Sequence, residues 1–370
     1  MDSVNSNRLK PLGSLQLMAV IMVVIVHFGR SDCFFMGVHW MTFCFIYSGF
    51  FTAMHHRFGP GYSLRDHGRF MWKKVAKLYP LHLLGIVWGI VVAWLVWDVH
   101  TVNLKALLAQ LTLTSPWIPD RQYYFAINPV AWYISDLFFL YLTAPLLVKL
   151  LRRCRPALQA VAVIVLLALE FAAGYCMTGE NGMTATGLYL LFEFPPIRLL
   201  DFAIGIVLYN LTRETWWTRL QSRVTTRNAT IIELGGIATA AILFQIEKLF
   251  LFDHCYRACC VVAPGIVVLL AIFLLTAANG GLVSRALSLK PVVALTTIGA
   301  EIYLLQYDVY FLMDPAFQRL GLHLYDAKQF ILYLAVLLLV AVLTHRFFTT
   351  PVKNWLLSKA PLRLTDQGHR

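Results

Sequence analysis

Apolar segments of similar length recur along the whole chain and alternate with short polar connections. They lie near residues 12–28, 34–54, 79–97, 131–148, 157–177, 194–211, 230–246, 258–278, 291–313 and 329–348. Each approaches the roughly 20 residues with which an α-helix crosses a hydrocarbon core of about 30 Å. The chain is also 59% hydrophobic and only 14% charged, a balance that polar surface could not cover in a water-soluble fold. We therefore expect an all-α, polytopic membrane helix bundle with about ten transmembrane helices, in one domain over residues 1–370.

The seventh segment is the weakest of the series. Its apolar stretch is short and contains Glu233, a costly side chain in lipid. Nine or eleven crossings therefore remain open alternatives to ten.

Lysine and arginine gather in alternate connections of the predicted bundle. They cluster at 57–77, 149–155, 213–227 and 285–290, and again in the tail from 346 to 370. Because short cytoplasmic loops accumulate these residues, both termini are expected in the cytoplasm, with a cytoplasmic tail over about 350–370. The formal net charge of +12 then reflects membrane orientation and attraction to anionic lipid. It requires no nucleic-acid partner.

His27 stands near the outer end of the otherwise apolar first segment. An ionisable side chain in a membrane span is a functional candidate by default, although His27 could instead meet water or headgroups at the interface. Gln16 precedes it by eleven residues, which is about three turns and roughly 16 Å of α-helix. The two side chains are therefore expected on one helix face.

Other polar residues also occupy costly positions in the predicted spans. Arg198 and Asp201 can pair across one turn of the sixth span, either to hold the bundle together or to contact substrate. Gly205 continues the same face and leaves room for close approach of another helix. The start of the fourth span carries Trp132, Ser135 and Asp136 on one face. The ninth span carries too many polar groups to face lipid, among them Glu301, Tyr303 and Gln306. The tenth span is apolar as far as His345, which is expected at the cytoplasmic headgroups.

A basic turn enters the membrane between the second and third spans and contains Lys73, Lys74 and Lys77. Lys74 and Lys77, three residues apart, could address a phosphorylated ligand from one face. Ordinary anchoring at the cytoplasmic surface is the competing explanation.

In their order along the chain, these segments resemble the acyltransferase-3 family of integral membrane O-acyltransferases. The shared landmarks are the first span ending in His27, the element Ile46-Tyr47-Ser48-Gly49-Phe50-Phe51, the basic turn before Leu78-Tyr79-Pro80-Leu81, Trp132-Tyr133-Ile134-Ser135, Arg198-Leu199-Leu200-Asp201-Phe202 with Gly205, and Glu301-Ile302-Tyr303-Leu304-Leu305-Gln306. The resemblance covers nearly the whole chain and implies a multi-pass protein of the bacterial inner membrane.

The resemblance also implies an activity and a division of roles. It implies transfer of an acyl group, acetyl in the first instance, from acyl-coenzyme A to a hydroxyl of a cell-envelope glycan or lipid-linked saccharide, with no metal. His27 would be the catalytic histidine, and Lys73, Lys74 and Lys77 would handle the coenzyme. Gln16, Trp132, Ser135, Asp136, Arg198, Asp201, Glu301, Tyr303 and Gln306 would support the site or orient the acceptor.

The chain departs from the family pattern at several of these positions. Gln16 stands where the family usually has arginine, lysines replace an arginine pair in the basic turn, and Gln306 stands where the family often has histidine. The acidic residue common before the last proline is missing from Thr349-Thr350-Pro351. All the substitutes can still form hydrogen bonds.

Two functions of other classes compete with acyl transfer. A transporter or flippase of a lipid-linked glycan would explain the buried polar groups, but the chain lacks the internal repeat that transporters commonly show. A catalytically inactive membrane scaffold is the third possibility, which the glutamine at position 16 favours.

Overall fold

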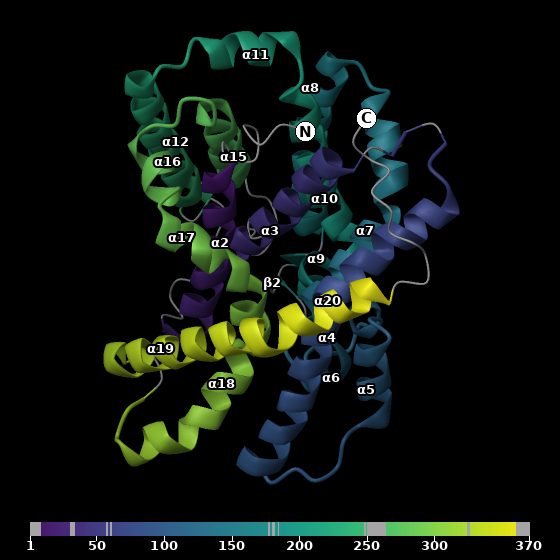
Figure 1. Cartoon of the computed structure of the whole chain (residues 1–370), viewed down its shortest axis with the longest axis vertical. Helices are drawn as coiled ribbons and strands as arrows, with labels where there is room; N and C mark the ends of the chain where they lie inside the picture. The colour runs from purple at the N-terminus through teal and green to yellow at the C-terminus, as the bar shows by residue number, and fades with distance from the viewer. Residues whose placement is uncertain are drawn as a thin grey trace. The chain divides into compact units, whose positions relative to one another are not determined.

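The structure is a computed structural model that describes residues 9–29, 34–56, 58–59, 61–176, 178–179, 182–183, 185–247, 249, 264–323 and 326–359. Contacts divide the chain into two compact units. The first unit comprises Met1–Val23, Phe34–Gly59 and Thr143–Thr297, and the second comprises Val24–Cys33, Pro60–Leu142 and Ile298–Arg370. Nearly all described elements are helices (Figure 1), which confirms the predicted all-α class.

Each of the ten predicted segments contains a helix. The first forms α2 (Lys10–Val24) and continues as the π-helix η1 (Ile25–Gly29). The others contain α3 (Phe34–His55), α4 (Leu64–Val96), α7 (Trp132–Arg152), α8 (Pro156–Cys176), α10 (Pro195–Leu211), α12 (Thr226–Ile246), α15 (Pro264–Thr276), α18 (Gly299–Arg319) and α19 (Ala327–Thr344). Among the described residues, 7 helices are long and apolar enough to cross a membrane. The helices α10, with 17 residues, and α15, with 13 residues, are shorter than these seven.

Short elements fill the connections between the long helices. They are α5 (Leu104–Leu111), η3 (Ser115–Trp117), α6 (Arg121–Tyr124), α9 (Ala185–Phe192), α11 (Thr215–Ser222), α16 (Leu282–Leu287), α17 (Lys290–Leu295), η5 (Thr296–Ile298), η6 (His345–Thr349) and α20 (Thr350–Ser358). The strands β1 (Thr178–Gly179) and β2 (Gly182–Met183) pair antiparallel. Part of the predicted cytoplasmic tail is therefore the helix α20, whereas residues 360–370 lie outside the described residues.

The first unit is centred on a close contact between α3 and α10. A Cβ atom added to Gly49 would collide with the backbone carbonyl of Phe202, and one added to Gly205 would collide with that of Ile46. The two helices therefore approach each other backbone to backbone, as small residues permit in membrane helices. This confirms that Gly205 provides a surface for close helix approach.

Glu233, which weakened the prediction of the seventh span, is fully buried in the first unit. Its carboxylate accepts hydrogen bonds from the backbone N–H groups of Gly281, Val283 and Ser284 and from the Ser284 hydroxyl. The charge is thus neutralised locally by donors at the start of α16, so α12 can be a membrane span despite the carboxylate.

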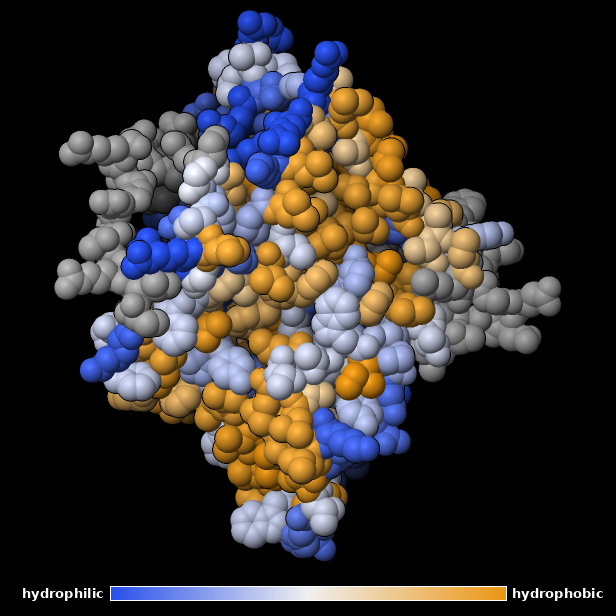
Figure 2. Space-filling view, turned by 90° about the vertical axis from the view of Figure 1, so that its right-hand side faces the viewer, coloured by the Kyte–Doolittle hydropathy of each residue, from blue (hydrophilic) through white to orange (hydrophobic). Residues whose placement is uncertain are grey.

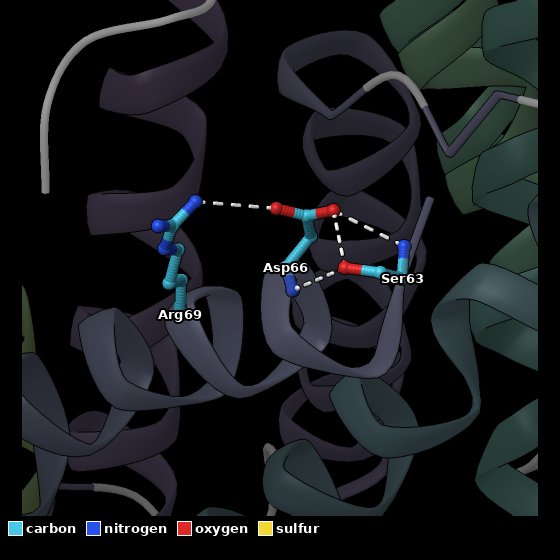
Figure 3. A network of polar contacts seen from close by, with 3 residues as sticks. All are labelled: Ser63, Asp66 and Arg69. Atoms are coloured by element: carbon cyan, nitrogen blue, oxygen red, sulfur yellow. Dashed lines mark hydrogen bonds and ion pairs between the residues drawn. The ribbon is translucent and has the colours of Figure 1, made fainter. Parts of the chain in front are cut away.

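In the second unit, α4 begins with a capping box. The Ser63 hydroxyl accepts from the Asp66 backbone N–H, the Asp66 carboxylate accepts from Ser63, and Arg69 contacts the same carboxylate (Figure 3). These bonds satisfy donors that a helix start leaves unpaired. From this start α4 continues to Val96, so the predicted basic turn with Lys73, Lys74 and Lys77 is helical rather than a break between spans. The helix packs against α18 and α20.

Hydrophobic side chains remain exposed along the outward faces of the long helices. On α8 these are Leu158, Val161, Ile164, Val165 and Leu169, which are each about half or more exposed. Hydrophobic residues also cover much of the face seen in Figure 2. Exposed apolar surface of this extent is what lipid-facing helices require.

Candidate functional site

His27 lies within η1, in the second unit. Its Nδ1 atom is 2.8 Å from Oε1 of Gln306 in α18, although the two residues are 279 positions apart in sequence. The half-buried imidazole also packs against the rings of Tyr307 and Phe28, with centroid distances of 5.1 and 5.9 Å. Because π-helical turns are rare and are frequently found at functional sites, η1 marks this position independently of the sequence pattern.

Gln306 is fully buried and is held in one orientation. Its side-chain Nε2 donates to the Tyr303 carbonyl at 2.8 Å, so Oε1 is the atom that faces His27. The Tyr333 hydroxyl of α19 donates to the Gln306 backbone carbonyl at 2.9 Å. Since an amide oxygen can only accept, the His27 Nδ1 carries the proton and Nε2 carries the lone pair. The arrangement selects the tautomer whose Nε2 can act as a base.

The first turn of α7 lies beside α18 in the same unit. Tyr133 packs edge-to-face on Tyr303 with ring centroids 5.0 Å apart, and the Trp132 ring contacts Tyr133. Ser135 and Asp136 are buried in the same turn. Through Tyr133, the start of α7 that carries these candidates therefore contacts Tyr303 of α18, the helix that also holds Gln306.

A buried polar chain that the sequence analysis missed fixes this arrangement. The Asn128 amide donates to the Leu304 carbonyl of α18 at 2.9 Å, and Gln110 donates to the carbonyls of Asn128 and Ala126. His82 of α4 donates from Nε2 to the Gln110 carbonyl. The rule that singled out His27, an ionisable residue inside an apolar segment, would also have found His82.

A second histidine contacts α18 five residues before Gln306. His345, the first residue of η6, donates from Nδ1 to Oε1 of the buried Glu301 at 2.8 Å, and its Nε2 lies 3.2 Å from the Thr350 hydroxyl. The position of His345 at the cytoplasmic headgroups stays a prediction, and the structure adds its bond with Glu301. Glu301 is therefore a partner of His345, and no contact between Glu301 and His27 was found.

The three lysines of the basic turn differ in their surroundings. The Lys74 ammonium lies 4.0 Å from the centroid of the Tyr141 ring and 5.2 Å from that of Phe70. Lys73 and Lys77 are exposed and, four residues apart, share one helix face. The geometry favours Lys73 and Lys77, rather than the predicted pair Lys74 and Lys77, as the cations available to an anionic ligand.

Arg198 and Asp201 form a buried pair in the first unit, as the i and i+3 spacing predicted, with Nη1 and Oδ2 3.0 Å apart. Arg198 also donates from Nε to the Phe192 carbonyl and lies over the rings of Phe45 and Phe192. These contacts support the interpretation of the pair as internal structure.

Gln16 is half-buried in α2 and belongs to the first unit, whereas His27 belongs to the second. The predicted shared face assumed α-helical geometry as far as His27, but the helix is π-helical from Ile25. The partnership of Gln16 with His27 therefore stays a prediction.

No group of three or more His, Cys, Asp or Glu side chains in the described part of the chain could hold a metal ion.

Comparisons with known proteins support one type of chemistry. A family model described as an acyltransferase domain matches residues 12–346, and therefore covers parts of both units. The acyltransferase MdmB of Streptomyces mycarofaciens is 26% identical over 245 residues, which is 57% of this chain and 59% of that protein. The match thus spans less than two thirds of the length of this relative. No solved structure matches the chain.

Proposed function

The chain belongs to the acyltransferase-3 family of membrane acyltransferases, and from this premise we propose that it transfers an acyl group, acetyl in the first instance, from acyl-coenzyme A to a hydroxyl of a cell-envelope glycan or a lipid-linked saccharide. The protein would act in the bacterial inner membrane, which the apolar helices and the family support. The family match favours acyl transfer over transport of a glycan.

The hydrogen bond between His27 and Gln306 carries this proposal. It leaves Nε2 of His27 as a base that can take the proton of an acceptor hydroxyl while the oxygen attacks the acyl carbonyl. The carbon–sulfur bond of the thioester then breaks, and the coenzyme leaves as a thiol after recovering that proton. Tyr307 and Phe28 flank the imidazole, and the half-buried Tyr307 offers an aromatic surface to a sugar or a short acyl chain.

Lys73 and Lys77 would hold the phosphates of the donor. Both are exposed on the helix that packs against α18, so the basic turn and the histidine belong to neighbouring elements of one unit. Clustered cations suit phosphate groups, and lysine provides them as mobile point charges. Lys74 would act indirectly, by fixing α4 through its contacts with Phe70 and Tyr141.

The proposal is tested with purified protein, radiolabelled acetyl-coenzyme A and an extract of envelope glycans. We expect label to enter the glycan, and His27→Ala to lower the rate by about a hundredfold or more. His55→Ala is the matched control, because His55 is an exposed histidine that bonds the Phe51 carbonyl of its own helix. Transfer that survives in His27→Ala would refute the assigned base.

A further inference from the structure

Glu301, His345 and Thr350 form a chain of hydrogen bonds that the proposed function does not use. Glu301 Oε1 accepts from Nδ1 of His345 at 2.8 Å, which fixes the tautomer and leaves the lone pair on Nε2. Nε2 faces the Thr350 hydroxyl at 3.2 Å, so the hydroxyl is the donor. A hydroxyl, a base and a carboxylate that orients the base, all within hydrogen-bond reach, are the parts of an activated nucleophile.

A π-helical turn creates this contact. The residues Ala327–Ser358 form one continuous helical rod of 32 residues, drawn in yellow in Figure 1, and η6 interrupts its α-helical geometry at His345–Thr349. In an α-helix, residues five apart point about 140° away from each other. A π turn instead closes with a hydrogen bond between residues five apart, here from the Thr350 backbone N–H to the His345 carbonyl, and the side chains of these two residues come within hydrogen-bond distance. The local distortion thus brings the two side chains together.

Glu301 is the most buried of the three residues in this chain of hydrogen bonds. Glu301 is 1% exposed, and its second oxygen, Oε2, has no hydrogen-bond partner among the described residues. The His345 side chain is 31% exposed, and Thr350 is half-buried. A buried carboxylate therefore supports a base and a hydroxyl that a ligand can reach, which is the order that acyl transfer to a side chain requires.

The surrounding elements connect this cluster to the basic turn. Both η6 and α20, which Thr350 begins, pack on α4. The Trp72 indole nitrogen of α4 also donates to the Leu356 carbonyl of α20 at 3.3 Å. Lys73 and Lys77 lie on the same helix, so a donor bound there through its phosphates would have its acyl arm near η6.

We propose that Thr350, activated by His345 and Glu301, accepts the acyl group from the coenzyme before it passes to the final acceptor. The Thr350 oxygen attacks the thioester carbonyl while His345 Nε2 takes the hydroxyl proton. The carbon–sulfur bond breaks, and the coenzyme sulfur leaves with that proton from His345, which gives a threonine ester and a free thiol. The acceptor hydroxyl then attacks the carbonyl of this ester, the bond between that carbonyl and the Thr350 oxygen breaks, and the acceptor's proton ends on the released Thr350 oxygen. This inference rests on the proposed function.

The test incubates the full chain in detergent with radiolabelled acetyl-coenzyme A and no acceptor. We expect protein-bound label that mass spectrometry assigns to Thr350 and that withstands neutral hydroxylamine, as an oxygen ester does, whereas an acyl-imidazole on His27 would be lost. Thr350→Ala should abolish the label and Thr350→Ser should retain it. His345→Gln should slow labelling about a hundredfold or more.

Thr349→Val is the matched control, because it removes a neighbouring hydroxyl that is buried and has no hydrogen-bond partner among the described residues. It should label and transfer normally. If the unaltered protein transfers acetyl but Thr350→Ala does so at the same rate, or if the label sits on His27, the inference is overturned and the proposed function stands. If the unaltered protein neither transfers nor carries label, the proposed function fails and the inference fails with it.

Discussion

At the scale of single residues, one hydrogen bond determines which nitrogen of His27 can act as a base. The family resemblance implies a histidine at position 306, and the fixed amide oxygen of Gln306 receives the Nδ1 proton of His27 instead. The substitution at position 306 therefore preserves an acceptor for His27 and is compatible with activity.

Gln306→Leu should lower the acyl-transfer rate by about tenfold to a hundredfold. The variant loses a hydrogen bond worth about 1–3 kcal/mol, and with it the acceptor that selects the tautomer of His27.

In Gln306→Glu, the added carboxylate would favour the protonated imidazole of His27, so the rising limb of the pH–rate profile should move to higher pH. Steady-state rates across a pH series check both. An unchanged profile for Gln306→Glu would show that His27 is not the titrating base.

Substitutions of the exposed Lys73 and Lys77 should weaken binding of the acyl donor without disturbing the fold. Replacing both Lys73 and Lys77 with alanine should raise the KM for acyl-coenzyme A about tenfold or more, since charged hydrogen bonds contribute about 1.5–3 kcal/mol each. The increase should shrink at high salt. Lys74→Met is the comparison, because Lys74 contacts rings, and its KM for acyl-coenzyme A should stay near that of the unaltered protein. Equal effects of the two changes would contradict the assignment.

At the scale of elements, η1 and η6 perform similar tasks. Each is a π-helix, and each holds a histidine that contacts α18, at Gln306 and Glu301. These two contacts on α18 are five residues apart, about 7.5 Å along the helix axis. Because residues five apart on an α-helix point about 140° away from each other, His27 and His345 contact α18 from different sides.

The backbone contact between α3 and α10 makes a prediction about stability. Gly49→Ala should destabilise the first unit by about 1–3 kcal/mol or more, because its Cβ would meet the Phe202 backbone carbonyl, which cannot rotate away. Gly235→Ala is the control, since its Cβ would meet nothing within 4 Å and alanine favours the helix. Thermal unfolding in detergent measures both variants. Equal midpoints for Gly49→Ala and the unaltered protein would refute the close contact.

At the scale of the whole molecule, the predicted topology can be tested without reference to the site. In a variant without native cysteines, Thr101→Cys should react with an impermeant maleimide on intact cells, because its connection is poor in cations. Arg153→Cys, in a cation-rich connection, should react only after the cells are permeabilised. Both residues are exposed. The opposite labelling pattern would invert the orientation.

Much of the architecture could be predicted because it depends on local properties of the chain. Helix length and apolar content identify membrane helices, so each of the ten predicted segments contains a helix in the structure. The pairing of Arg198 with Asp201 and the close approach at Gly205 also followed from spacing along one helix. The polar candidates were identified by their cost in lipid.

The sequence alone thus determined the helical membrane class and identified His27 as a candidate, because both follow from residue types and their spacing. Only the tertiary structure decided the partners. Gln306 is 279 positions from His27, and Glu301 is 44 positions from His345. The π turns also change the directions in which side chains project around the helix axis, and α-helical spacing does not predict these directions. Partners so distant are brought together by packing, so only the folded chain identifies the hydrogen-bonded groups that chemistry would use.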